Sequence, residues 1–335
     1  MERMNALIVQ KPGDVAVRAW DDPSLGSLDV LVEVKACGIC GTDRHIAEGS
    51  YPATYPNVLG HEFAGTVTDV GDAVQWIEKG DAVAVDPNIP CHQCVPCRRG
   101  DIHLCERLQA IGVTRPGGMA PRVAVPQSQA YRLPANLSVR DAAFAEPLSC
   151  VIHGLERVKL PMGSSVAILG AGSIGLLMQQ AVRAIGASSV TVSEPSPARR
   201  NLAEELGADE VYTPEMIDHA SHANAYDLVI DCTGNTDVIA STIRLARRGA
   251  DILLFGVAPA GKQTALEPYE LYRKELRLVA SNINPFTMDK AITMLANGMV
   301  KVDRIVSQRV SLQELPALLL SKPSPDEVKI TLEFG

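Results

Sequence analysis

Residues 166–175 read VAILGAGSIG, in which Gly170, Gly172 and Gly175 form the spacing GxGxxG. A short apolar run precedes the glycines and a helix-like stretch follows, which is the context of a dinucleotide-binding turn. Such glycines let the backbone approach a pyrophosphate at the positive end of a helix. Glu194 lies 19 residues after Gly175 and can accept hydrogen bonds from an adenosine ribose. Glycines with this spacing also occur in simple strand-to-helix turns, but the spacing, the acid and the flanking elements together favour a nucleotide site.

Around this motif, strand-like and helix-like segments alternate. This alternation is typical of a doubly wound parallel α/β sheet. The predicted strands are 166–169, 190–193, 227–231 and 252–256, and the predicted helices are 174–185, 197–206 and 237–246.

The first 150 or so residues have a different sequence pattern, with short β-rich runs separated by Pro and Gly. The predicted strands there are 30–35, 63–70, 82–86 and 122–125. A helix at 288–297 and a last strand at 328–334 follow the α/β region. A chain of 335 residues exceeds the size at which single cores stop growing, roughly 250 to 300 residues, so we expect two domains.

Composition and charge exclude several classes of protein. Hydrophobic residues make up 46% and charged residues 21%, which is ordinary for a globular protein. The net charge of −8 opposes binding to nucleic acid or to an anionic membrane surface. Neither a signal peptide nor a membrane-spanning run is recognised, so we expect a cytoplasmic protein whose cysteines are thiols or metal ligands.

Four of the eight cysteines are clustered as CxxCxxCx7C, at Cys91, Cys94, Cys97 and Cys105. Four thiolates complete a tetrahedral zinc shell, which predicts a closed structural site. An iron–sulfur or redox role is the alternative, but ferredoxin-type runs continue with a three-residue gap and a CysPro pair. Four unrelated thiols are the remaining interpretation.

A second set of possible ligands is dispersed along the chain. It comprises Cys40 in CGICGTD, His61 and Glu62 in GHE, and Glu146 in EPLS. One sulfur, one imidazole and carboxylates make a mixed shell that can leave a zinc position open to water or substrate. Each residue taken singly would more often be a core or surface residue.

These motifs, in this order, resemble the zinc-dependent medium-chain alcohol dehydrogenases over essentially the whole chain. The glutamate in EPLS makes the sorbitol (polyol) dehydrogenase-like branch the most similar. The resemblance implies a GroES-like β-rich catalytic domain at 1–148 and 288–335 and a Rossmann domain at 149–287. It also implies two Zn²⁺ ions per chain, NAD as cofactor, and a homodimer or homotetramer.

The resemblance further implies roles for individual residues. Cys40, His61 and Glu146 would hold the catalytic zinc, with Glu62 ligating it directly or through water. Thr42 would contact the alcohol and His45 would relay its proton, although a turn-stabilising Thr and a solvated His are simpler readings. The implied cofactor-binding residues are Gly170, Gly172, Ser173, Ile174, Gly175, Glu194, Arg199, Gly256, Val257, Ser281 and Asn282.

The resulting expectation is an enzyme that transfers hydride between NAD and a secondary alcohol of a small polyol, sugar alcohol or cyclitol. Zinc would act as Lewis acid on the alcohol oxygen. An amino-alcohol (threonine-type) dehydrogenase is the first alternative, and a non-catalytic nucleotide-binding relative is the second. The sequence identifies neither the substrate nor its stereochemistry.

Overall fold

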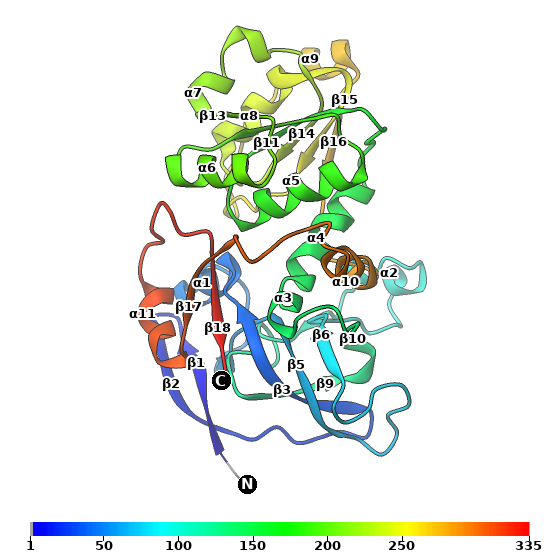
Figure 1. Cartoon of the computed structure of the whole chain (residues 1–335), viewed down its shortest axis with the longest axis vertical. Helices are drawn as coiled ribbons and strands as arrows, with labels where there is room; N and C mark the ends of the chain where they lie inside the picture. Colours follow the sequence, from blue (N-terminus) through cyan, green and yellow to red (C-terminus); the bar gives the residue numbers. More distant parts are fainter. Residues whose placement is uncertain (1–2, 335) are drawn as a thin grey trace. The chain divides into compact units, whose positions relative to one another are not determined.

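The computed structural model describes residues 3–334, which form two units (Figure 1). The first unit comprises the chain up to Pro147, Met288–Asn297 and the chain from Val306 on. The second unit comprises Leu148–Thr287 and Gly298–Ile305. The segment 298–305, which the sequence-based division places in the catalytic domain, therefore packs with the second unit.

The first unit is built on three antiparallel or mixed sheets. Their orders are β2-β1-β4, β10-β6-β5-β3-β18-β17 with β9 also paired to β3, and β7-β8. The strands are β1 Arg3–Lys11, β2 Asp14–Asp21, β3 Asp29–Gly38, β4 Asn57–Val58, β5 Glu62–Val70, β6 Ala82–Val85, β7 Asn88–Ile89, β8 Gln109–Ala110, β9 Arg122–Pro126, β10 Ala130–Arg132, β17 Val306–Val310 and β18 Lys329–Glu333.

The helices of this unit are short. They are α1 Gly41–Glu48, α2 Val95–Arg98, α3 Val139–Ala142, α10 Met288–Ala296 and α11 Leu315–Leu320, with 3-10 turns η1 Ile102–Leu104, η2 Gln127–Gln129 and η4 Leu312–Glu314.

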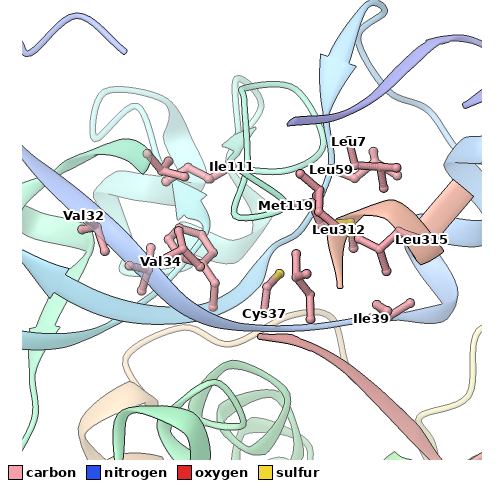
Figure 2. Close-up of a cluster of buried hydrophobic side chains, with 14 of the residues drawn as sticks. Leu7, Val32, Val34, Cys37, Ile39, Leu59, Ile111, Met119, Leu312 and Leu315 are labelled. Carbon is pink, nitrogen blue, oxygen red and sulfur yellow. The ribbon is translucent and has the colours of Figure 1, made fainter. Parts of the chain in front are cut away.

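Strand β3 shows how the sequence pattern forms the core of this unit. Val30, Val32 and Val34 alternate with more exposed residues and are completely buried. Figure 2 shows Val32 and Val34 among the buried side chains, together with Leu59 from the segment before β5 and Leu315 from α11. The core is therefore made of residues far apart in the sequence, and β3 lies between β5 and β18 in the sheet.

The second unit has one six-stranded parallel sheet of order β13-β12-β11-β14-β15-β16. Its strands are β11 Ser165–Leu169, β12 Ser189–Ser193, β13 Glu210–Tyr212, β14 Tyr226–Asp231, β15 Ala246–Leu254 and β16 Arg277–Ala280. The helices are α4 Ala145–Glu156, which begins before this unit, α5 Ser173–Ile185, α6 Pro197–Glu205, α7 Pro214–Ile217, α8 Thr236–Leu245 and α9 Pro268–Lys274, with the 3-10 turn η3 Ala220–His222.

This order places the first strand, β11, next to β14, so the strand order reverses between them. Ligands of doubly wound sheets bind at such a switch point, beyond the carboxyl ends of the strands. A β-rich unit and a unit with a doubly wound parallel α/β sheet agree with the predicted fold class.

Among the predicted segments, the largest difference from the observed boundaries occurs where α8 is followed by β15. The helix predicted at 237–246 ends at Leu245, because Ala246 already pairs with Tyr226 of β14. The strand predicted at 252–256 instead spans Ala246–Leu254. Local propensity does not show this pairing, since it depends on the neighbouring strand. No helix within residues 3–334 is long and apolar enough to cross a membrane.

Candidate metal and cofactor sites

The four clustered cysteines converge in one lobe of the first unit. The sulfur atoms of Cys91, Cys94, Cys97 and Cys105 all lie within 4.8 Å of one another. The Sγ atoms of Cys94 and Cys105 are 3.9 Å apart, which excludes a disulfide of about 2.05 Å. Two Zn–S bonds of about 2.3 Å at a tetrahedral angle separate their sulfurs by about 3.8 Å. The donor set therefore fits a zinc ion.

Backbone donors stabilise these sulfurs in the thiolate form that zinc requires. The N–H groups of Gln93 and Cys94 lie 3.5 and 3.4 Å from the Cys91 sulfur and lower the pKa of Cys91 to about 5. The N–H of Arg107 donates to Cys105 at 3.4 Å. Burial and the neighbouring sulfurs raise the pKa of Cys97 to about 12, so a metal has to displace the proton there.

Three of the dispersed candidates come together at the junction of β3 and β5. Cys40, His61 and Glu62 each offer a ligand atom, and these atoms lie within 4.8 Å of one another. Cys40 caps the N-terminus of α1 just after β3, whereas His61 and Glu62 stand at the start of β5. Antiparallel pairing of Gly38 with Glu62 brings the end of β3 beside the start of β5. One sulfur, one imidazole and one carboxylate fit a catalytic zinc shell.

Asp43, which was not predicted from the sequence, contacts two of these residues. Its Oδ2 accepts a hydrogen bond of 2.9 Å from the backbone N–H of Cys40, and its Oδ1 lies 3.5 Å from Nδ1 of His61. Burial opposes a charge on His61, but Asp43 and then Cys40 raise its pKa well above the ordinary value. A carboxylate at Nδ1 fixes the tautomer and leaves Nε2 for a metal. The spacing of Asp43, three residues after the cap, is a capping-box signal that could have indicated it.

Lys329 is a second supporting residue that the sequence did not indicate. Its ammonium forms an ion pair with Oε2 of Glu62, and both side chains are almost completely buried. The two residues are separated by most of the chain, and an isolated lysine carries no sequence signal.

Glu146 is not part of this group of three. It stands in the first turn of α4 and is buried, whereas the ligand atoms that lie within 4.8 Å of one another belong to Cys40, His61 and Glu62. Thr42 and His45 both belong to α1. Thr42 is half-buried, whereas His45 is exposed with Nδ1 3.2 Å from the Ser50 hydroxyl.

The glycine motif forms a tight turn from β11 into α5. Gly172 caps the helix, and a Cβ at Gly175 would lie 1.9 Å from the carbonyl oxygen of Gly170. Only glycine allows this close approach between helix and loop. Glu194, which follows β12, is buried and accepts hydrogen bonds from Ala171 N at 2.8 Å and Ser196 N at 3.0 Å.

A cavity of about 790 Å³ lies at the carboxyl ends of these strands. Its lining includes Gly170, Gly172, Glu194 and Arg199, together with Thr233 after β14. Arg199 Nη1 is 3.9 Å from Oε1 of Glu194. The remaining predicted cofactor residues do not line this cavity: they are Ser173, Ile174, Gly175, Gly256, Val257, Ser281 and Asn282.

Both units match known protein families. Residues 26–135 match the model of the alcohol dehydrogenase GroES-like domain, and residues 173–297 match that of zinc-binding dehydrogenases. D-arabinitol dehydrogenase 1 of Uromyces fabae is 30% identical over 342 residues, covering 99% of this chain and 97% of the relative. D-altritol 5-dehydrogenase of Agrobacterium fabrum is 33% identical, covering 91% of each chain.

Among solved structures, a zinc-binding dehydrogenase of Sinorhizobium meliloti 1021 bound to NADP superposes with a TM-score of 0.97. It is 39% identical and covers 99% of this chain and all of its own. The chain therefore belongs to the zinc-binding alcohol dehydrogenase family. The expected enzyme class, an oxidoreductase that uses zinc and a nicotinamide cofactor, is confirmed.

Proposed function

We propose that this enzyme transfers hydride between NAD and a secondary alcohol of a small polyol, sugar alcohol or cyclitol. The observation that carries the proposal is the convergence of the ligand atoms of Cys40, His61 and Glu62. The motif EPLS supplies Glu146 as the proposed second carboxylate. A shell with two carboxylates is harder and more hydrophilic than one of two thiolates, and it suits a substrate with several hydroxyls. Relatives named for D-arabinitol and D-altritol support this substrate class.

In the proposed site, Cys40, His61 and Glu146 hold the zinc ion, while Glu62 ligates it or contacts it through water. Zinc supplies a Lewis acid that lowers the pKa of the alcohol, and NAD supplies the hydride acceptor. Asp43 lies at Nδ1 of His61 and holds the ring so that Nε2 is available to the metal. The lobe of Cys91, Cys94, Cys97 and Cys105 holds the second, structural zinc.

A proton has to leave the alcohol, and α1 offers a route. We assign the receiving hydroxyl to Thr42 and the outward relay to His45. The exposure of His45 and its 3.2 Å contact with the Ser50 hydroxyl support this assignment, because the ring is placed to exchange protons with water.

We further propose that residues 1–148 and 288–335 act as the catalytic domain and 149–287 as the nucleotide domain, with 298–305 packed on the latter. The glycines at 170, 172 and 175, with Ser173 and Ile174, would hold the pyrophosphate, and Glu194 and Arg199 the adenosine. Gly256, Val257, Ser281 and Asn282 remain proposed contacts of the cofactor. We also propose a cytoplasmic homodimer or homotetramer, which size-exclusion chromatography with light scattering would test.

A substrate panel tests the function directly. The purified enzyme, NAD and each of a hexitol, a cyclitol, ethanol, benzyl alcohol and threonine are compared by NADH absorbance at one pH. We expect a higher kcat/KM on at least one polyol or cyclitol than on the other three compounds. The highest kcat/KM on threonine would identify an amino-alcohol dehydrogenase instead, and no oxidation of any compound would favour a non-catalytic relative.

A further inference from the structure

The ion pair between Lys329 and Glu62 crosses an intervening strand. Lys329 begins β18, Glu62 begins β5, and β3 lies between these two strands in the sheet. Glu62 pairs with Gly38 on one side of β3, and Thr331 pairs with Gly38 on the other. The two side chains must therefore meet over the backbone of Gly38.

Gly38 leaves the space for this meeting. A Cβ at this position would lie 2.2 Å from Oε2 of Glu62 and 2.9 Å from Cε of Lys329. Both distances are shorter than a Cβ tolerates, so a side chain at this position would displace the ends of the Glu62 and Lys329 side chains. The absence of a side chain at Gly38 therefore allows the two charged side chains to meet across β3.

The contact lies where negative charge accumulates. Glu62, Asp43 and the sulfur of Cys40 surround His61, and all except Cys40 are almost fully buried. The Lys329 side chain is the cation that meets the Glu62 carboxylate. A carboxylate buried without a counter-ion is strongly unfavourable, so Glu62 needs a cation.

We propose that Lys329 is a positioning residue that holds the Glu62 carboxylate away from the catalytic metal, so that one metal position stays open to substrate. This inference rests on the proposed zinc site, and of its two arrangements for Glu62 it selects contact through water rather than direct ligation. An ammonium and a metal ion compete for the same carboxylate oxygens. Without Lys329, the metal is the cation that remains beside Glu62, and the carboxylate becomes a permanent ligand that fills the open position.

The experiment uses the full-length enzyme with two zinc ions, and a second preparation with cobalt at the catalytic site. In Lys329→Met, which keeps the apolar stem, we expect kcat to fall and the catalytic metal to leave to a chelator about tenfold more slowly. The cobalt absorption spectrum should change in the direction of a higher coordination number. Lys329→Arg should restore the wild-type rate of metal release and spectrum.

A double variant isolates the cause. When Glu62→Gln is combined with Lys329→Met, the slow release should disappear, because no carboxylate remains to bind the metal. Glu62→Gln alone should leave the cobalt spectrum nearly unchanged, and this result does not depend on whether Lys329→Met folds. Lys274→Met is the matched control: Lys274 is also buried and donates to Ile243 O at 2.7 Å, but it lies in the other unit. Its loss should not change metal release.

Release from Lys329→Met at or above the wild-type rate would overturn the inference, as would a strong spectral change in Glu62→Gln alone. These results are separable from failure of the proposed function. A wild-type enzyme with one zinc, or without polyol oxidation, refutes the proposed function itself. Two zinc ions and normal activity with the wrong response at Lys329 refute only the positioning role.

Discussion

The two metal-binding groups of this protein are assembled in different ways. The lobe group uses four cysteines from one stretch of fifteen positions, 91–105, and its supporting N–H donors come from Gln93, Cys94 and Arg107 in or beside the same stretch. The dispersed group takes Cys40 from one segment and His61 and Glu62 from another. Its supporting charges, Asp43 and Lys329, come from α1 and the distant strand β18.

This difference predicts how the protein responds to loss of a ligand in each group. A lobe with local ligands and little core of its own gains its folding free energy from the metal. Loss of a metal ligand there should therefore impair folding. The dispersed group lies where β3 ends and β5 begins, in a unit that already has a large buried core. That core holds the ligands in place without the metal. Loss of a ligand there should therefore lower turnover more than it lowers stability.

The largest expected effect is on the lobe. Cys94→Ser removes one of four thiolates and should strongly reduce soluble yield and Tm, because structural zinc contributes on the order of 10 kcal/mol to the folding of small metal-binding modules. Differential scanning fluorimetry and elemental analysis measure both effects. Cys150→Ser, which lies outside both groups, is the control and should keep two zinc ions per chain. A Cys94→Ser protein with wild-type Tm would contradict the expectation that the lobe group contributes more to folding than the dispersed group.

A large effect on turnover, with little effect on folding, is expected in the dispersed group. Glu146→Ala should lower kcat about a hundredfold or more and reduce the metal content, while Tm changes little. Glu156→Ala, at the exposed end of the same helix, is the matched control. Unchanged kcat and metal content in Glu146→Ala would exclude Glu146 from the shell of metal ligands.

The smallest effect is expected outside both metal groups, at the nucleotide cavity. The wild-type enzyme should prefer NAD, because two like charges 4 Å apart cost about 4 kcal/mol at an effective dielectric of 20, and a third of that is about tenfold. Arg199, with Nη1 3.9 Å from Glu194, reduces this discrimination. In Glu194→Gln the ratio of kcat/KM for NAD over NADP should fall about tenfold.

The control for this experiment is Glu215→Gln, which removes the same charge from an exposed residue lining the same cavity. Its ratio should change much less. If NADP is used as well as NAD by the wild-type enzyme, then Glu194 does not select the cofactor, and the hydrogen bonds from Ala171 and Ser196 to its carboxylate define a purely structural role.

Local features could be predicted well from the sequence because their causes are local. The glycines at 170, 172 and 175 predicted the turn from β11 to α5, and Ser196 with Pro197 marks the start of α6, where the Ser196 hydroxyl accepts from Arg199 N at 3.3 Å. Boundaries set by a neighbouring strand were less predictable. The early start of β15 at Ala246 depends on pairing with Tyr226, which no local pattern reveals.

By itself, the sequence determined the fold class, the family and the four-cysteine group, because short-range spacing fixes turns, caps and adjacent ligands. Only the tertiary structure showed that Asp43 supports His61, that Lys329 neutralises Glu62, and that Gly38 leaves room for that ion pair. These contacts arise from the order of strands β5, β3 and β18 in one sheet. Strand order brings together residues hundreds of positions apart, and long-range pairing of this kind has no periodicity or spacing along the chain that could reveal it.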